Sequence, residues 1–330
     1  MSFGGLCHTG SDGPGGGKPL DITVVTTRAE ALREAIEGEL AERVPEHVSL
    51  RYFSDPGHLD AMALSAEVAL GAPDVLAPLI ASMPSLRWVQ STWAGVTPLL
   101  EVGQRDYVLT GVKDIFGASM SEYALGWVLA IERSVLVHAN ASQWEFRIDR
   151  GLSELRVGVA GVGSIGSAVA GSFAGMVKEV RGLNSDGRPA KGCHSCFGTA
   201  DRLSFAKNLD VLIMVLPDTP GTDGLVDARV LSQLAPGALV INAGRANALD
   251  LPAALAARES GQLRALVLDV FDKEPLADDD PLWAIPGVYI TSHTAAPTRM
   301  ESIAGVFVDN LERYLSGAEL EGIINFERGY

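Results

Sequence analysis

One glycine-rich turn between two short apolar strands constrains this chain more than any other feature. The segment Leu155–Ala160 reads as a buried strand, and the turn Gly161-Val162-Gly163-Ser164-Ile165-Gly166 follows it. We expect a helix to about Met176 and a second strand that ends near Asn184. Gly161 permits the sharp turn, Gly163 lets a pyrophosphate approach the backbone, and Gly166 lets the helix pack against the strand. The segment therefore predicts a dinucleotide site at a helix N-terminus, with a purely structural strand–helix turn as the alternative.

The rest of the chain alternates between strand and helix patterns, which is typical of a parallel α/β sheet. A length of 330 residues suggests two domains rather than one. Before the turn we expect strands at 21–27, 48–53, 86–91 and 107–110, helices at 28–42, 73–83 and 119–137, and a helix or buried connection at 59–70. After the turn we expect strands at 210–217, 238–242, 265–271 and 288–291, and helices at 228–234, 252–260 and 301–315.

The residues after the second strand bear on which dinucleotide binds. In the NAD version of this arrangement an acidic residue at this place accepts the ribose hydroxyl groups. Here the place is held by Asn184, which has no charge, while Arg188 can pair with a 2′-phosphate and Ser185 can donate a hydrogen bond to it. Asp186 lies between them and leaves NAD open. We expect NADP to be preferred, with NAD as the alternative.

Three ionisable residues follow three successive strands of the predicted sheet: Arg245, Glu274 and His293. The carboxyl ends of parallel strands form the edge at which such sheets bind ligands. Each residue alone has an ordinary structural explanation, but together they suit hydride transfer to a carbonyl. Arg245 would bind a carboxylate and polarise the adjacent keto oxygen, His293 would donate the proton, and Glu274 would hold the other imidazole nitrogen. No metal is needed for this chemistry.

Charge and composition exclude several classes of protein. A net charge of −15 argues against a nucleic acid or an anionic membrane as partner. No apolar run reaches the length of a membrane span, and the first residues lack the pattern of a secretory signal. Three cysteines do not make a disulfide framework, and Cys193 and Cys196 lack further zinc ligands nearby, so we expect two reduced thiols in a loop at a strand edge. A cytoplasmic location is the simplest fit.

The helix predicted at 119–137 carries a broad apolar surface, and Trp144 and Phe146 follow it in a polar setting. A contact with a second copy of the chain explains both features. An internal satellite core is an equally good explanation.

The sequence resembles the D-isomer-specific 2-hydroxyacid dehydrogenases. The likeness extends from about Leu86 to the C-terminus and depends on Asn242-Ala243-Gly244-Arg245, on Leu268–Leu276 and on Thr291-Ser292-His293. Within this family the chain is most similar to the glyoxylate/hydroxypyruvate reductase A type. That second likeness is seen in Leu216–Thr222, Pro281-Leu282-Trp283 and the ending Asn325–Tyr330. Two positions depart from the family pattern, because Ala246 replaces a usual glycine and Ser164 replaces a frequent arginine.

The resemblance implies a fold, a domain plan and a set of site residues. The fold class would be α/β with two Rossmann-like domains: a flavodoxin-like substrate domain (19–109 and 298–330) and a doubly wound NAD(P)-binding domain (110–297). The glycine- and serine-rich residues 1–18 have no periodic apolar pattern, and their composition predicts a disordered leader. The resemblance also implies a homodimer and catalytic roles for Arg245, Glu274 and His293. The substrate carboxylate would bind Arg245 and the turn Trp93, Ala94, Gly95 and Val96, although an ordinary strand–helix loop also explains that turn. Further cofactor contacts are implied for Ser164, Ile165, Leu216, Pro217, Thr222, Ala243, Asp269 and Ala295.

The predicted activity is the NAD(P)H-dependent reduction of a small 2-oxo acid to a D-2-hydroxy acid. The alternative is a binding protein on the same fold that senses NAD(P)H without turnover. The sequence leaves open which 2-oxo acid is the substrate and which direction the reaction takes in the cell.

Overall fold

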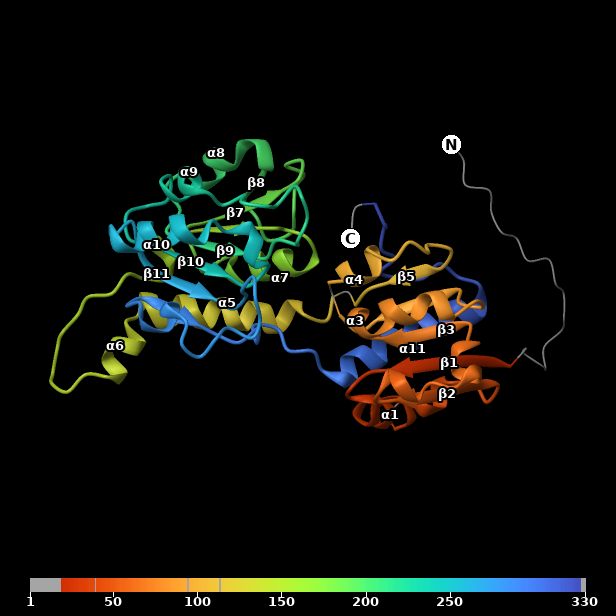
Figure 1. Cartoon of the computed structure of the whole chain (residues 1–330). Helices are drawn as coiled ribbons and strands as arrows, with labels where there is room; N and C mark the ends of the chain where they lie inside the picture. Colours follow the sequence, from red (N-terminus) through yellow and green to blue (C-terminus); the bar gives the residue numbers. More distant parts are fainter. Residues whose placement is uncertain (1–18, 39, 94, 113, 328–330) are drawn as a thin grey trace. The chain divides into compact units, whose positions relative to one another are not determined.

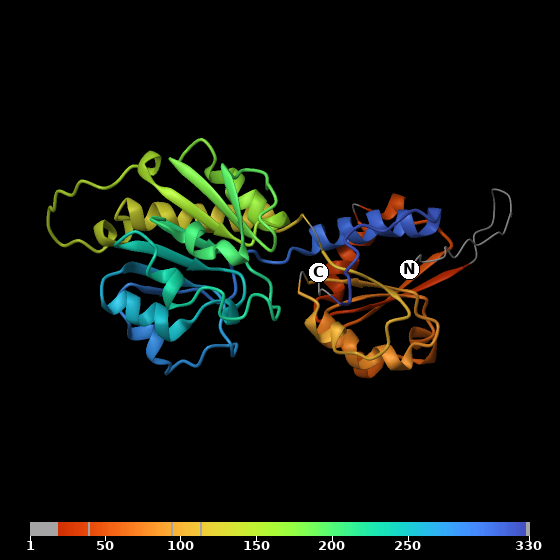
Figure 2. The same ribbon diagram turned by 90° about the horizontal axis from the view of Figure 1, so that it is seen from above.

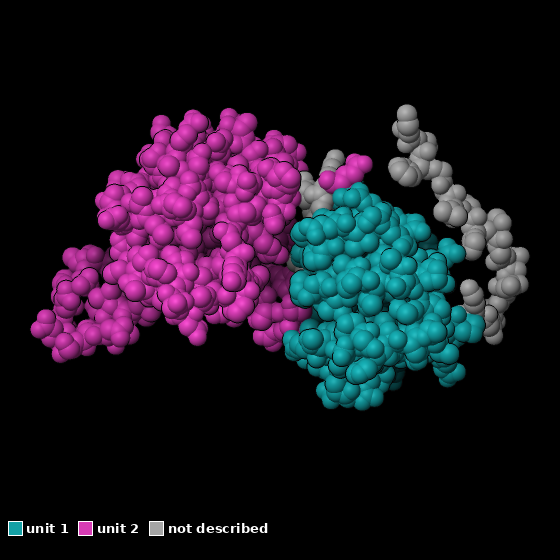
Figure 3. All heavy atoms as spheres, viewed as in Figure 1, with its two compact units in different colours: residues 1–111, 300–326, 330 teal, residues 112–299, 327–329 magenta. Residues whose placement is uncertain are grey.

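Two compact units make up the protein. The computed structural model describes residues 19–38, 40–93, 95–112 and 114–327. Unit 1 combines the described residues up to Gly111 with Met300–Phe326, and unit 2 combines the described residues of Val112–Arg299 with Glu327 (Figure 3). The predicted leader lies outside the described residues. Each unit has its own sheet and its own hydrophobic core.

Unit 1 is built on a parallel sheet. Within the described residues this sheet has five strands in the order β2-β1-β3-β4-β5, which is the flavodoxin-like order. The strands are β1 (Leu20–Val25), β2 (Val48–Phe53), β3 (Val68–Gly71), β4 (Trp88–Ser91) and β5 (Val108–Thr110). The helices are α1 (Ala29–Glu37), α2 (Ala61–Leu64), α3 (Pro73–Leu76), α4 (Thr97–Leu100) and α11 (Met300–Ser316), with short 3-10 turns η1 (Ala41–Arg43), η2 (Pro56–His58) and η3 (Ala77–Ser82).

The last helix, α11, covers one face of the unit 1 sheet together with α1. Figure 2 shows α11 beside α1 on one face of the unit 1 sheet, with α3 and α4 on the other face. The buried Trp88 ring of β4 stacks on Phe307 and Tyr314 of α11, with ring centroids 5.6 and 5.3 Å away. Residues from the two ends of the chain therefore share one core.

Unit 2 is a doubly wound sheet. The described strands run in the order β12-β11-β10-β9-β6-β7-β8, with all neighbouring pairs parallel. They are β6 (Arg156–Ala160), β7 (Glu179–Asn184), β8 (Ser195–Gly198), β9 (Val211–Met214), β10 (Ala238–Asn242), β11 (Leu263–Leu268) and β12 (Val288–Ile290). The helices are α5 (Gly117–Glu132), α6 (Val135–Ala139), α7 (Ser164–Phe173), α8 (Arg202–Ala206), α9 (Ala228–Leu231) and α10 (Leu251–Glu259), with 3-10 turns η4 (Leu152–Glu154), η5 (Thr199–Asp201), η6 (Ala246–Ala248) and η7 (Pro281–Ala284). The order reverses between β6 and β9, and ligands bind at such a reversal in this class of sheet.

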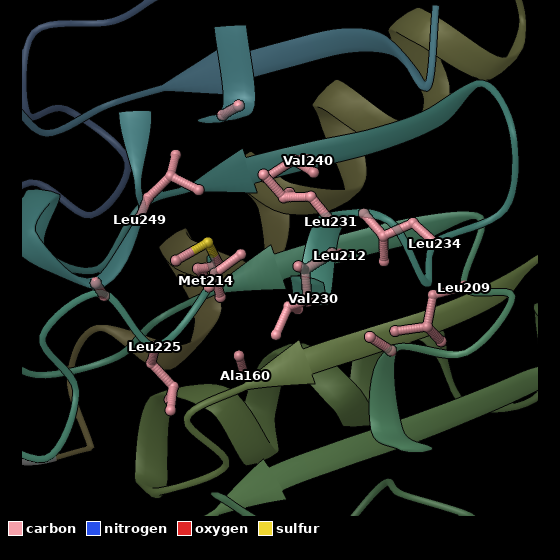
Figure 4. Packing of buried hydrophobic residues seen from close by; sticks show 14 of the residues in the cluster. Ala160, Leu209, Leu212, Met214, Leu225, Val230, Leu231, Leu234, Val240 and Leu249 are labelled. Atoms are coloured by element: carbon pink, nitrogen blue, oxygen red, sulfur yellow. The ribbon is translucent and has the colours of Figure 1, made fainter. Parts of the chain in front are cut away.

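Helices cover both faces of the unit 2 sheet. On one face, buried residues of α8, α9 and α10 (Figure 1) share one cluster with Leu212 and Val240 of the central strands. Figure 4 shows part of this cluster. On the other face α5 and α7 contribute Val128 and Phe173 to a second buried cluster. The predicted fold class, two Rossmann-like domains with a flavodoxin-like and a doubly wound sheet, is thus confirmed. Among the described residues, no helix combines the length and apolar character that crossing a membrane requires.

The structure corrects four predicted elements. The segment 59–70 holds the short helix α2 and then begins strand β3, which lies at the centre of its sheet. The first helix ends at Glu37 rather than near residue 42, because Gly38 follows it. The helix expected to reach residue 137 stops at Glu132, since Ser134 adopts a left-handed conformation with φ of 50°. Finally, Cys196 belongs to an edge strand, β8, rather than to a loop.

Candidate active site

The glycine turn joins β6 to α7 as the sequence predicts. Gly161 has a φ of 97°, and a Cβ there would lie 2.7 Å from the Val215 carbonyl oxygen. A Cβ on Gly166 would lie 2.2 Å from the Gly161 carbonyl oxygen, so both positions require glycine. Gly163 differs, because no atom of the described residues lies within 4 Å of its Cβ position. It is also the N-cap of α7 and makes no side-chain cap. Open space above an uncapped helix N-terminus suits a pyrophosphate group.

The side chain of Ser164 has a partner within the protein. Its hydroxyl donates a hydrogen bond to the Asp114 carboxylate. The next residue, Ile165, is half-buried in the first turn of α7 and packs toward the core of unit 2. A contact between Ser164 and a bound pyrophosphate would therefore have to come from its backbone N–H or follow a change of hydrogen-bond partner.

The loop after β7 is held together by its own polar groups. Asn184 donates to the Arg188 carbonyl oxygen at 2.8 Å and accepts from the Gly187 backbone N–H at 2.6 Å. The exposed Arg188 guanidinium binds Asp186 at 3.1 Å, and the Arg188 backbone N–H and guanidinium hold the pKa of that carboxyl below its ordinary value. Ser185 is exposed beside them. Asn184 thus shapes the loop, while Ser185 and Arg188 present polar groups to solvent at the end of the strand.

Backbone packing brings the turns after β9 and β10 together. The Thr222 hydroxyl donates to the Pro217 carbonyl oxygen at 2.7 Å and closes the turn that follows the buried Leu216. Ala243 donates from its backbone N–H to Met214 at 3.0 Å, so the ends of β9 and β10 stay in register. These predicted cofactor residues lie on the same edge of the sheet as the glycine turn.

Glu274 and His293 are in direct contact. The Nδ1 atom of His293 lies 2.7 Å from Oε2 of Glu274, and both side chains are partly exposed. The other carboxylate oxygen of Glu274 accepts from the Phe271 backbone N–H at 3.0 Å, which fixes the acid. With Nδ1 held in this way, Nε2 is the nitrogen that can donate to a substrate.

Arg245 reaches the same edge from the neighbouring strand. It follows β10, Glu274 follows β11, and His293 follows β12, and these strands are adjacent and parallel. Its Nη1 donates to the Gly244 carbonyl oxygen at 2.8 Å, and its own carbonyl oxygen accepts from Asn242 at 3.1 Å. In the described part of the chain no ion pair or hydrogen bond links Arg245 to the other two residues. The structure therefore joins two members of the predicted trio and places the third on their edge.

The predicted carboxylate turn belongs to the other unit. Trp93 follows β4 with its side chain 42% exposed, and its backbone N–H donates to the Ser91 hydroxyl at 2.9 Å. Val96 is buried just before α4, and Gly95 lies between them. Ala94 lies outside the described residues.

Asp269 has a role that the sequence did not reveal. Its side chain is 1% exposed, and its carboxylate accepts from Thr291 Oγ1 at 2.5 Å, from the Thr294 N–H at 2.8 Å and from the Ala295 N–H at 3.0 Å. Its carbonyl oxygen accepts from the His293 N–H at 2.9 Å. Asp269 therefore shapes the loop that carries His293. A buried acid directly after an apolar strand was the available signal in the sequence.

Cys193 and Cys196 have no further metal ligands beside them among the described residues. Cys193 and Cys196 are free thiols, and the described residues contain no group of three side chains that could hold a metal ion. Burial and the neighbouring Cys196 thiol raise the pKa of Cys193 to about 12. Cys193 is therefore a protonated, weakly nucleophilic thiol near neutral pH.

Comparison with known proteins gives a consistent result. The family model for the NAD binding domain of D-isomer specific 2-hydroxyacid dehydrogenases matches residues 128–295, which include the glycine turn, Arg245, Glu274 and His293. A solved family protein from Aeromonas salmonicida is 30% identical, with a TM-score of 0.85 over 94% of this chain and 100% of that chain.

Two further solved structures extend the comparison. The NADPH-dependent glyoxylate/hydroxypyruvate reductase of Sinorhizobium meliloti, crystallised with NADP and sulfate, is 27% identical, with a TM-score of 0.81 over 94% of this chain and 100% of that chain. A D-isomer specific 2-hydroxyacid dehydrogenase from Xanthobacter autotrophicus, in complex with NADPH and MES, is 28% identical, with a TM-score of 0.80 over 94% of this chain and 99% of that chain. The chain therefore belongs to the D-isomer specific 2-hydroxyacid dehydrogenase family and is an NAD(P)-dependent dehydrogenase or reductase.

Proposed function

We propose that this enzyme reduces small 2-oxo acids such as glyoxylate or hydroxypyruvate to D-2-hydroxy acids, with NADPH as the preferred cofactor. The observation that supports this proposal most strongly is the 2.7 Å contact between His293 and Glu274, on the sheet edge that also holds Arg245 and the glycine turn. The solved reductase of Sinorhizobium meliloti acts on this class of substrate by its description.

Each residue of the trio has a defined task in this proposal. The bound nicotinamide supplies the hydride. The Arg245 guanidinium binds the substrate carboxylate as a planar fork and polarises the neighbouring keto oxygen. His293 then gives the proton on Nε2 to that oxygen as the alcohol forms. Glu274 holds Nδ1 and stabilises the charged imidazolium form from which the proton leaves.

The proposal also includes residues of the turn after β4 and of the His293 loop. We assign the turn Trp93–Val96 of unit 1 to the substrate carboxylate, because backbone N–H groups at a strand–helix turn can bind an anion. The Trp93 N–H already donates to Ser91, so the backbone N–H groups of Gly95 and Val96 would bind the carboxylate. Asp269 and Ala295, at the base of the His293 loop, are assigned to the nicotinamide end of the cofactor.

A substrate panel tests the proposed function directly. Purified protein is mixed with NADPH and with glyoxylate, hydroxypyruvate or a series of larger 2-oxo acids, and the loss of NADPH absorbance is followed. We expect turnover with the smallest substrates and a fall in kcat/KM as the side chain grows. If NADPH is oxidised with none of these acids, the proposed substrate class is wrong.

The preference for NADP depends on Arg188. Its guanidinium is exposed at the end of β7, and the strand ends in the uncharged Asn184. Replacing Arg188 by alanine should raise KM for NADPH about tenfold and leave KM for NADH near its original value, since a charged hydrogen bond is worth about 1.5–3 kcal/mol. Steady-state kinetics with both cofactors measures this change. Arg33→Ala, which removes another exposed ion-paired arginine in unit 1, is the control. Equal losses with both cofactors would contradict the assignment.

We also propose a homodimer formed through an arm of unit 2, residues 134–150. The arm extends away from the sheet of unit 2 in Figure 1 and exposes Trp144, Phe146 and Ile148 by 96, 79 and 88%. Large apolar side chains exposed to this degree in succession are characteristic of an interface. A second copy of the chain is the partner we assign to the arm, because it is present wherever the protein is.

The cytoplasmic location expected from the sequence stays a prediction, which cell fractionation tests.

A further inference from the structure

The buried carboxylate of Asp269 is compensated entirely by hydrogen-bond donors. No arginine, lysine or histidine pairs with it among the described residues, although its side chain is 1% exposed. Its three donors all come from the segment after β12: the Thr291 hydroxyl and the backbone N–H groups of Thr294 and Ala295. A buried carboxylate that loses one of these donors becomes costly, so this set of contacts is maintained as a whole.

These contacts determine where His293 sits. The residue lies between the donors to Asp269, and its own N–H donates to the Asp269 carbonyl oxygen at 2.9 Å. Its φ is 54°, a left-handed conformation that residues with side chains rarely adopt. The loop keeps this conformation because it is tied to Asp269 on both sides of the histidine.

The Asp269 carboxylate fixes the direction of the hydrogen bonds that join it to Thr291 and Tyr123. The Tyr123 hydroxyl of α5 lies 2.8 Å from Thr291 Oγ1. A carboxylate only accepts hydrogen bonds, so the single Thr291 proton goes to Asp269. The Tyr123 hydroxyl must then donate to Thr291. Burial, with the nearby Asp269 charge, raises the pKa of Tyr123 to about 12, so this donor stays protonated at any working pH.

We propose that Tyr123 and Thr291 are positioning residues for the reaction. In a chain of hydrogen bonds, called the relay below, Tyr123 donates to Thr291 and Thr291 donates to Asp269. This relay holds the loop that presents His293 to the substrate. The relay deepens the function proposed above and rests on it for the role of His293. Neither residue contacts the reacting atoms. Both act through Asp269. The Trp127 ring packs edge-on against the Tyr123 ring and is itself in contact with the Tyr289 ring.

Removing single hydroxyl groups tests the relay. Thr291→Val keeps the shape of the side chain and removes the donor, so we expect kcat to fall about 10- to 100-fold through misplacement of His293. The Kd for NADPH should rise much less than kcat falls, because the glycine turn is untouched although Asp269 and Ala295 are assigned to the nicotinamide end of the cofactor. Thr291→Ser keeps the hydroxyl and should restore most of kcat. Tyr123→Phe should have a smaller effect, and the double variant Tyr123→Phe/Thr291→Val should be no slower than Thr291→Val alone.

A second measurement is independent of activity. Hydrogen exchange of the peptide that spans Thr294 and Ala295 should become faster in Thr291→Val and in Tyr123→Phe, because the Asp269 acceptor is loosened. Tyr107→Phe is the control, since it removes a buried hydroxyl of unit 1 that has no hydrogen-bond partner within the described part of the chain. It should change neither kcat nor exchange in this peptide.

The outcomes separate the relay from the proposed function. If the original enzyme reduces none of the 2-oxo acids, the proposed substrate is wrong, and the exchange rates still decide whether the relay holds the loop. If the enzyme is active and Thr291→Val keeps its kcat and its exchange rates, the relay is refuted. Failure of Thr291→Ser to recover activity would also refute it, because the hydroxyl is then not the relevant group.

Discussion

His293 combines an unfavourable backbone with a precise hydrogen bond. A left-handed conformation costs a residue with a side chain about 1–2 kcal/mol, and the φ of 54° at His293 is in that range. The contacts to Asp269 compensate for this cost, and the side chain is directed to Glu274 at 2.7 Å. Replacing the histidine removes a proton donor without disturbing the contacts that its backbone makes.

Substitution of His293 by asparagine should separate catalysis from binding. We expect kcat to fall about 10²- to 10⁴-fold, the usual contribution of a positioned acid, with little change in the Kd for NADPH. Stopped assays with each 2-oxo acid give kcat, and quenching of tryptophan fluorescence gives Kd. His58→Asn, at an exposed histidine of unit 1, is the control. An unchanged kcat in His293→Asn would remove this residue from the proton-donor role.

At the scale of elements, helix α7 offers a matched pair of glycines. A Cβ on Gly166 would lie 2.2 Å from the Gly161 carbonyl oxygen, whereas nothing lies within 4 Å of the Cβ position of Gly171 in the same helix. Gly166→Ala should therefore destabilise the protein by about 1–3 kcal/mol and weaken NADPH binding. Gly171→Ala should be neutral or stabilise by up to about 1 kcal/mol through helix propensity. Chemical denaturation and cofactor titration of both variants measure these effects, and equal behaviour of the two would contradict the packing argument.

A buried ionic cluster anchors both ends of the arm. Arg150 binds Asp210 at 2.7 Å and Glu132 at 3.2 Å, and the Glu132 side chain has no exposed surface. Ser134 donates to Asp149 at 2.8 Å across the base of the arm. Burial raises the pKa of Glu132 and lowers the pKa of Arg264, its second partner, so the cluster is stable only while the ions remain paired.

Loss of Arg150 should therefore affect stability more than loss of its neighbour. Arg150→Ala leaves buried acceptors on Glu132 and Asp210 and should cost about 1–3 kcal/mol. Arg147→Ala breaks an exposed pair with Glu145 and should cost at most about 1 kcal/mol. Thermal unfolding of the two variants provides the comparison. A larger loss in Arg147→Ala would show that the cluster does not anchor the arm.

Elements with a clear periodic pattern could be predicted from the sequence, and elements without one could not. Strands β2 and β10 have the predicted bounds, since their apolar runs are flanked by polar residues or glycine. Strand β3 was missed because Val68-Ala69-Leu70-Gly71 continues an alanine-rich stretch that favours a helix. Its strand conformation is decided by pairing with β1 and β4, and no local pattern reports such pairing.

For the whole molecule, the arm makes a prediction about assembly. Trp144→Ser combined with Phe146→Ser removes the two largest exposed apolar groups of the arm and should convert a dimer into a monomer. Sedimentation velocity measures the change. Met62→Ser, at an exposed methionine of unit 1, is the control and should leave the assembly intact. A dimer that persists in the double variant would place the interface elsewhere.

The sequence predicts which residues gather at the site, but it does not predict the hydrogen-bond partners of their side chains. Strand order and the glycine turn bring Arg245, Glu274 and His293 to one edge, and this follows from topology alone. The partners of individual side chains do not follow, because they depend on distances of a few tenths of an ångström. Asn184, expected to face the cofactor, also ties its own loop together, and Asp269 binds the backbone beside the histidine. Contacts of this kind are set by the folded chain and leave no periodic trace in the sequence.

The discontinuous make-up of unit 1 has a consequence for biosynthesis. On the ribosome, β1–β5 emerge first. The stacking partners of Trp88, Phe307 and Tyr314 of α11, are synthesised only after Val112–Arg299 of unit 2. The buried core residues of unit 2 all precede α11, so this core can close while α11 is still in the exit tunnel. The nascent chain therefore completes its second domain before its first, and during that interval the open face of the first sheet is the part of the protein that most needs a chaperone.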